Sequence, residues 1–313
     1  MPTDPIGTVK RELLVRRLES WAPGALGRSR RLTFAQAYSG ADQGAAEAAL
    51  RVFVEYADRL RGRRVSVLTL APAHDDLVTR LGAVEAELPA EVSVLLVPGP
   101  VDRLPVALRA AGAAGAPVLA YLDASDGPAP DPDALAAVAA ARPGELLLAL
   151  GPRARAGFDH RTALEAAGFP LVAGIELVAG DDTQLLALGT SAGKALDAFK
   201  DALWEVDEFA GVRYRDPRDP HGHLLDIATE PHPGPLRREL LARLVRYGPD
   251  TVTELRRFTA AETAFRASDT NRALAGLLAA GQVSRSPEHG RLGGDVLITA
   301  GPQVAAVDDS SSS

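Results

Sequence analysis

Five short apolar runs, each bounded by glycine or proline and separated by stretches with helical spacing, constrain this fold most strongly. They are RLTFAQAY (31–38), RVSVLTLA (64–71), VSVLLVPG (92–99), PVLAYLDA (117–124) and ELLLALGP (145–152). Such runs are typical of strands that are buried on both faces, as in a parallel sheet covered by helices. The sequence therefore predicts an α/β domain with five parallel strands.

The apolar pair that follows, over residues 170–190, needs a different connection. Only AGDD (179–182) separates its two halves. A parallel crossover requires a dozen or more residues, so these two strands must be antiparallel neighbours. Five parallel strands followed by an antiparallel hairpin is the order of class I methyltransferase-like Rossmann folds. We expect such a domain, with an additional N-terminal helix, over residues 1–212.

The amino-acid composition of the chain changes after this domain. Residues 213–232 are rich in proline, histidine and charge, which indicates a linker. Three helical segments follow, and then QVSRSP and GDVLITA enclose a glycine-rich turn, which is the pattern of a winged helix-turn-helix domain over 233–301. The polar tail, 302–313, is predicted to be disordered.

Composition excludes several kinds of protein. The chain has no cysteine, so disulfides, thiolate zinc sites and a cysteine nucleophile are excluded. No apolar run approaches the roughly 18 residues of a membrane span, and the N-terminus lacks a signal-peptide core, so we expect a cytoplasmic protein. His221 and His223 lie two apart without a third ligand nearby in sequence, so no metal site is predicted.

Several motifs occur in a fixed order along residues 8–300. The opening helix carries Lys10, Leu14, Leu18 and Trp21; FAQAYSGADQG and VLAYLDASDG follow; ALDAFKDALWEVD (195–207) supplies Lys200, Asp201, Trp204 and Asp207; and ETAFRASDTNRALAGLLAAGQV lies near the end. Together they resemble the three-Cys-motif partner protein (TcmP) family. The resemblance implies a bacterial protein with a methyltransferase-like domain, a C-terminal winged helix and a protein partner that carries a three-cysteine motif.

The loop after the first apolar run is the candidate cofactor site. A strand, a glycine-rich turn and a helix hold nucleotide-like cofactors in α/β proteins. Gln36, Tyr38, Gly40 and Asp42 stand in register with the family's Asp-x-Phe-Ala-Gly-x-Gly loop, which implies contacts to S-adenosylmethionine. However, Gln36 replaces the acid, and Asp42 replaces the second glycine with a charged side chain. The loop is therefore interpreted as degenerate.

Two further positions depart from the same pattern. The second run ends in Leu70, Ala71 and Pro72, where an acid ordinarily holds the ribose hydroxyls. After the fourth run Asp123 is kept as a weak catalytic candidate, but Ser125 stands where an aromatic side chain could stack on a base. These losses predict that no cofactor binds usefully; if the pocket is retained, its cofactor is S-adenosylmethionine.

Charge separates the C-terminal segment from the rest of the chain. Residues 233–301 hold ten arginines against seven acids, although the whole chain has a net charge of −7. This asymmetry favours contact with nucleic acid. In a winged helix, Asn271 and Arg272 would lie at the start of the third helix, and Arg285 and Arg291 in the wing. We expect weak binding of duplex DNA through these four residues, and a protein-docking role is the alternative.

Three hypotheses follow from these observations. The first is a three-Cys-motif partner-like protein whose methyltransferase-like domain has lost its cofactor, a pseudo-methyltransferase acting with a partner protein and nucleic acid. The second is an active S-adenosylmethionine-dependent nucleic-acid methyltransferase. The third is a winged-helix DNA-binding regulator. The loss of all three pocket signatures favours the first hypothesis.

Overall fold

The computed structural model describes residues 4–40, 44–72, 75–206, 211–225 and 232–301. The chain divides into two compact units, Met1–Leu225 and Asp226–Ser313. Asp42, Asp207 and the tail 302–313, for which the sequence made predictions, lie outside the described residues.

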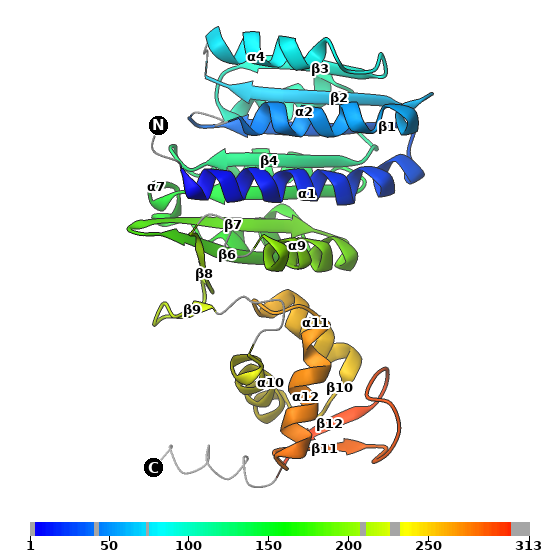
Figure 1. Cartoon of the computed structure of the whole chain (residues 1–313), viewed down its shortest axis with the longest axis vertical. Helices are drawn as coiled ribbons and strands as arrows, with labels where there is room; N and C mark the ends of the chain where they lie inside the picture. The colour runs from blue at the N-terminus through cyan, green and yellow to red at the C-terminus, as the bar shows by residue number, and fades with distance from the viewer. Residues whose placement is uncertain (1–3, 41–43, 73–74, 207–210, 226–231, 302–313) are drawn as a thin grey trace. The chain divides into compact units, whose positions relative to one another are not determined.

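The first unit is built on a mostly parallel sheet in the order β3-β2-β1-β4-β5-β7-β6-β8-β9 (Figure 1). The strands are β1 (Arg31–Tyr38), β2 (Arg64–Ala71), β3 (Val92–Pro98), β4 (Val118–Ala124), β5 (Gly144–Leu150), β6 (Leu171–Ala179), β7 (Asp182–Thr190), β8 (Arg213–Arg215) and β9 (Leu224–Leu225). Strands β1 to β5 pair only in parallel with one another. The prediction of an α/β domain with five parallel strands is confirmed.

Strands β6 and β7 form the predicted hairpin. β7 pairs antiparallel with both β6 and β5, so the hairpin belongs to the same sheet. The turn between the strands is Gly180–Asp181, and Gly180 has a φ of 59°, a left-handed conformation that glycine adopts at little cost. The short connection therefore dictates the antiparallel pairing, as the sequence predicted.

The region expected to be a linker, 213–232, is in part a continuation of the sheet. β8 pairs antiparallel with β6, and β9 pairs antiparallel with β8. Tyr214 of β8 is buried, which supplies apolar burial that a linker would not have. The sequence pattern missed these strands because they are only three and two residues long and lie among prolines and charges. The boundary between the two units falls after Leu225.

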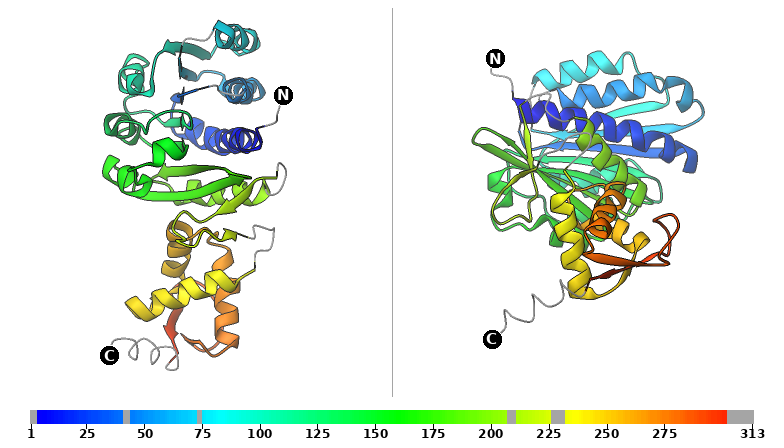
Figure 2. Two further views of the ribbon diagram at one scale, coloured as in Figure 1. Left: turned by 90° about the vertical axis from the view of Figure 1, so that its left-hand side faces the viewer. Right: turned by 60° about the horizontal axis from the view of Figure 1, so that its bottom comes forward.

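Helices cover both faces of this sheet, as the side view in Figure 2 shows. The helices of the first unit are α1 (Pro5–Arg28), α2 (Ala45–Glu55), α3 (Ala57–Leu60), α4 (Asp75–Glu85), the 3₁₀ turn η1 (Val101–Arg103), α5 (Leu104–Ala110), α6 (Pro132–Ala139), α7 (Pro152–Arg155), α8 (His160–Ala167) and α9 (Gly193–Glu205). Helices α4, α2, α1 and α9 pack side by side on one face, and α5, α6 and α8 on the other. This coverage explains why β1, β4 and β5 are apolar along almost their whole length.

Helix α1 places its apolar stripe on the middle of the sheet, between α2 and α9. The helix begins where Asp4 accepts a hydrogen bond from the Gly7 N–H at 2.8 Å, with Pro5 in the first turn. Leu13, Leu14 and Leu18 on this stripe are buried. Among the described residues, no helix combines the length and apolarity that a membrane span requires.

The second unit consists of three helices and a small sheet. Its elements are α10 (Gly234–Tyr247), β10 (Asp250–Thr251), α11 (Val252–Glu262), α12 (Asp269–Ala279), β11 (Val283–Ser286) and β12 (Leu297–Ala300). β12 pairs antiparallel with β10 and β11. The core of the unit includes Leu240, Leu255, Leu274 and Ile298, all fully buried.

Candidate functional site

Two cavities lie where β1 and β4 end, at the carboxyl edge of the parallel sheet. β1 and β4 are neighbours in the sheet, and the strands that follow each of them run outward in opposite directions. The resulting crevice is the place where open α/β sheets ordinarily bind ligands. Tyr38 at the end of β1 and Asp123 near the end of β4 border both cavities.

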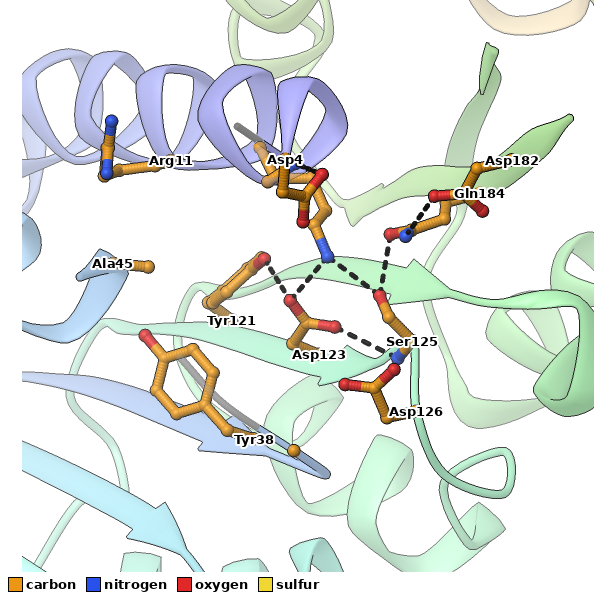
Figure 3. A pocket seen from close by; sticks show the side chains of 13 residues that line it. Asp4, Arg11, Tyr38, Ala45, Tyr121, Asp123, Ser125, Asp126, Asp182 and Gln184 are labelled. Carbon is orange, nitrogen blue, oxygen red and sulfur yellow. Dashed lines mark hydrogen bonds and ion pairs between the residues drawn. The ribbon is translucent and has the colours of Figure 1, made fainter. Parts of the chain in front are cut away.

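The first cavity is polar and has a volume of about 180 Å³. Helix α1, the end of β1, the loop after β4 and strand β7 each contribute to its wall, as Figure 3 shows. Its ionisable side chains are Lys10, Arg11, Asp4, Asp123, Asp126 and Asp182. Four carboxylates therefore face two bases, which gives this cavity a negative balance of charge.

Asp123 is the centre of the hydrogen-bond network in this cavity. Its Oδ2 accepts from the Lys10 ammonium at 2.9 Å and from the Tyr121 hydroxyl at 2.8 Å (Figure 3). Its Oδ1 accepts from the backbone N–H of Ser125 at 3.0 Å. Lys10 also donates to Ser125 Oγ at 2.8 Å, and that hydroxyl donates to Gln184 Oε1 at 2.9 Å. One network thus joins α1, β4 and β7.

The electrostatics of this network oppose proton transfer near neutral pH. Burial raises the pKa of Asp123, but the Lys10 ammonium and the hydrogen bonds from Ser125 and Lys10 outweigh it, so the pKa lies below its ordinary value. Burial, with the neighbouring charge of Asp123, holds the pKa of the Tyr121 hydroxyl well above its ordinary value. The carboxylate therefore stays ionised and the phenol stays protonated, whereas a general base works best with a pKa near the operating pH.

The loop after β1 is packed against the loop after β4. A Cβ at Gly40 would lie 2.3 Å from Asp126 Oδ2, so the space that this glycine leaves open is filled by the chain itself. A Cβ at Gly127 would similarly lie 2.6 Å from the Ser39 Cβ. The Asp126 N–H also donates to Ser39 Oγ at 3.2 Å. Gly40 therefore lies in close contact with the Asp126 side chain, and the two loops pack against each other.

The second cavity is larger, about 300 Å³, and mostly apolar. Its wall is formed by Ala37, Tyr38, Ser39, Pro72, Gly99, Pro100, Val101, Asp102, Leu122, Asp123, Ala124, Gly127, Pro128 and Pro130. β2 ends in Leu70 and Ala71, followed by Pro72, so no carboxylate lies at the end of this strand. Among the described residues at the end of β2 there is thus no acid to pair with ribose hydroxyls, and the two acids that border this cavity are Asp102 of η1 and Asp123 of β4.

The structure brings together three of the five sequence-predicted residues of this unit. Tyr38, Gly40 and Asp123 line the polar cavity. Gln36 is fully buried within β1, where its amide donates to Thr69 Oγ1 and accepts from the Tyr38 hydroxyl, both at 2.9 Å. It is not among the residues that line the two cavities, because both ends of its amide are bonded inside the sheet.

The sequence did not predict the roles of Lys10, Tyr121 and Gln184. Lys10 was recognised only as part of a motif, yet it provides the counter-ion of Asp123. The sequence did contain one signal. Lys10 lies on the same helical stripe as Leu13 and Leu14, where burying an ammonium without a carboxylate partner would cost free energy. Gln184 gave no signal, because the hairpin that carries it is distant in sequence from α1.

Of the four nucleic-acid candidates in the second unit, the structure places two in one cavity. Asn271 and Arg291 line a hollow of about 280 Å³. The Arg272 guanidinium lies 3.8 Å from the Asp269 carboxylate, and Arg272 does not line this cavity. Arg285 donates to the carbonyls of Pro287, Gly290 and Arg291, so its guanidinium is bonded within its own turn. Arg256, which the sequence did not single out as a contact residue, joins the cavity from α11.

Metal binding and similarity to known proteins add little to this geometry. Across the described ranges, no group of three or more histidine, aspartate or glutamate side chains is placed to hold a metal ion.

No protein-family model matches the sequence, and no curated protein matches it. A crystal structure of EvdMO1 is similar at a TM-score of 0.36 and 17% identity, over 58% of this chain and 42% of EvdMO1. The delta-N METTL16 MTase domain is similar at a TM-score of 0.34 and 13% identity, over 61% of this chain and 85% of that domain.

Proposed function

We propose that the first unit is a class I methyltransferase-like domain without useful S-adenosylmethionine binding, and that the protein acts through a partner protein and nucleic acid. The observation that carries this proposal is the closed network around Asp123. The Lys10 ammonium donates to the Asp123 carboxylate at 2.9 Å, so the chain itself supplies the cation that pairs with this acid. Because both carboxylate oxygens already accept hydrogen bonds from the chain, Asp123 serves as an anchor for α1.

The fit of the cofactor supports the same proposal. Gly40 would have to present open backbone to S-adenosylmethionine, but the Asp126 carboxylate covers it. At the end of β2 the ribose hydroxyls would meet Pro72 in place of an acid, and the acids of this cavity, Asp102 and Asp123, come from other elements. Each lost polar contact costs on the order of 1–3 kcal/mol, and two or three such losses would take a micromolar site toward millimolar affinity. The residues present do not fit this cofactor.

Calorimetric titration of the full chain with S-adenosylmethionine tests this part of the proposal. We expect no dissociation constant below about 50 μM. Asp126→Ala removes the side chain that covers Gly40, and a gain of binding in that variant would identify Asp126 as the obstacle. Asp182→Ala is the matched control, because it removes another carboxylate from the same cavity but does not lie against Gly40. Tight binding by the unaltered protein would contradict the proposal.

The second unit is assigned to the winged-helix class within this proposal. Its order of three helices followed by an antiparallel pair, with β10 completing a three-stranded sheet, supports the assignment. The resemblance to the TcmP family supplies the expected protein partner, which carries the three-cysteine motif. Co-expression with such a protein should give a complex that co-elutes on size exclusion, and separate elution would argue against the partnership.

An active methyltransferase is the second candidate, and the apolar cavity favours it. A hollow of about 300 Å³ at the carboxyl ends of the strands is large enough for an aromatic ring. If this alternative holds, labelled methyl groups from S-adenosylmethionine will be transferred to a nucleic acid by the unaltered protein. The transfer should be lost in Asp123→Asn, and the variant's circular dichroism spectrum should verify that it still folds.

A further inference from the structure

One cavity of the second unit is built where three separate elements meet. Arg256 comes from α11, Asn271 from the first turn of α12, and Arg291 with Leu292, Gly293 and Gly294 from the segment that joins β11 to β12. The cavity has a volume of about 280 Å³. Three elements distant in sequence therefore bring two guanidinium groups and a glycine pair to one place.

The two arginines of this cavity differ from those arginines of the unit that pair with an acid. Arg243 pairs with Asp250 at 2.9 Å, Arg257 with Glu254 at 3.0 Å, and Arg266 with Asp269 at 3.1 Å. Within the described residues, Arg256 and Arg291 are exposed and have no carboxylate partner. The acids nearest to Arg256 in sequence, Asp250 and Glu254, are thus engaged by other arginines, and the cavity gathers two arginines whose charge no carboxylate offsets among the described residues.

The glycine pair is held in place before any ligand arrives. Gly294 O accepts from the Thr253 N–H at 3.2 Å and from the Thr253 hydroxyl at 3.0 Å. Asn271 Nδ2 donates to Leu292 O at 3.1 Å, which ties α12 to the same segment. In the described part of the chain, the N–H groups of Gly293 and Gly294 donate to no backbone carbonyl. They remain available as donors to a ligand on a segment whose position is fixed.

We propose that this cavity binds a phosphate oxyanion, and that its source is the phosphodiester backbone of duplex DNA. Two arginines and backbone N–H groups are the donor set that recognises phosphate. Asn271 Oδ1 is a buried acceptor without a partner among the described residues, and a water that donates both to it and to a phosphate oxygen would satisfy it. The proposal rests on the winged-helix assignment of the second unit and is independent of cofactor loss in the first.

The experiment is fluorescence anisotropy of the full chain with a labelled 20-base-pair duplex over a series of salt concentrations. Arg256→Gln and Arg291→Gln each remove one charge from the cavity, and we expect each to weaken binding about tenfold. Arg238→Gln is the matched control, because Arg238 is an exposed arginine on α10 outside the cavity wall. A labelled single strand of the same length tests whether the duplex is required.

The salt dependence sharpens this test. Each phosphate contact adds roughly 0.9 to the slope of log K against log salt. If both arginines hold one phosphate, the double variant loses about 0.9 of slope rather than about 1.8. Gly293→Ala keeps the charge, and its added Cβ meets nothing within 4 Å, so the fold should accept it. We expect weaker binding in this variant because the methyl group obstructs approach to the backbone.

Two outcomes overturn the proposal. The first is a double variant that binds duplex as Arg238→Gln does. The second is no duplex binding by the unaltered protein at low salt. In that case, inorganic phosphate compared with chloride at matched ionic strength shows whether the cavity takes a free phosphate instead. Each of these results leaves the calorimetric test of S-adenosylmethionine unaffected, so the two proposals fail separately.

Discussion

Helix α1 carries two buried bases seven residues apart, and each is paired with an acid of the sheet. Lys10 pairs with Asp123 near the end of β4, and Arg17 pairs with Glu145 near the start of β5. The side chains of the first pair are 8% and 14% exposed, and those of the second are 4% and 6% exposed. The two pairs thus anchor the same helix at opposite edges of the sheet.

The surroundings of the pairs differ more than their burial does. Both border a hollow, but only the Lys10 pair lies at the carboxyl edge, where a sheet of this type binds ligands. Asp123 also accepts hydrogen bonds from Tyr121 and Ser125, whereas the Glu145 carboxylate accepts from Arg17. A buried ion pair therefore indicates a site only when its position and its other partners agree.

The largest expected effect comes from removing the base of the deeper pair. Arg17→Met leaves Glu145 buried without its ion-pair partner, and the free energy of unfolding should fall by about 3–5 kcal/mol. Urea denaturation followed by circular dichroism measures the change. The double variant Arg17→Met, Glu145→Leu should recover most of the loss, because an apolar pair of similar volume replaces the charges. If Arg17→Met costs less than Lys10→Met, the ranking of the two pairs is wrong.

The sequence predicted the framework of the first unit better than its site. Runs of apolar residues specify buried strands, and AGDD leaves room only for a hairpin, so the core topology followed from local pattern. The network around Asp123 depends on Lys10, Tyr121 and Gln184, which meet only after α1 and β7 have packed beside β4. Such contacts have no local signature. The base in the apolar stripe of α1 was the one clue that a buried acid had to exist.

A smaller effect, which depends on pH, is expected at the Lys10 pair. Lys10→Met should cost about 1–3 kcal/mol at neutral pH, because Asp123 keeps the Tyr121 and Ser125 donors. In the unaltered protein the pKa of Asp123 is lowered, so its stabilisation is present above the unfolded value of about 3.9 and is lost as the pH falls through the folded pKa. Without the ammonium, burial should instead raise this pKa.

The sign of the pH dependence therefore reverses in the variant. A group with a raised folded pKa contributes its stability at low pH and loses it as the pH rises through that value. The difference in the free energy of unfolding between the unaltered protein and Lys10→Met should be small near pH 3 and largest above about pH 6. Urea midpoints across this range measure it, with Lys10→Met, Asp123→Asn as the control that removes the titration. A gap independent of pH would show that the ion pair does not govern the site.

Two arginines of the second unit differ in a similar way: one side chain holds the fold, and the other is placed to contact a ligand. The expected effect of changing them is the smallest. Arg285 donates at 2.9 Å to Pro287 O and at 3.0 Å to Gly290 O, with a longer bond to Arg291 O. Arg291 lines the cavity, and its side chain makes no such bond within the described residues. The sequence grouped both as DNA contacts, but the structure gives Arg285 a role in holding the turn.

Arg285→Gln should consequently lower the free energy of local opening by about 1 kcal/mol, the net value of a typical intramolecular hydrogen bond or slightly more. Hydrogen–deuterium exchange of peptides that cover residues 284–297 measures this opening in the full chain. Arg291→Gln should leave the exchange unchanged while it weakens binding to duplex. Equal hydrogen–deuterium exchange in the two variants would show that Arg285 and Arg291 do not differ in holding the turn. Loss of DNA binding in Arg285→Gln with unchanged exchange would make Arg285 a direct contact, since its effect could not then act through the turn.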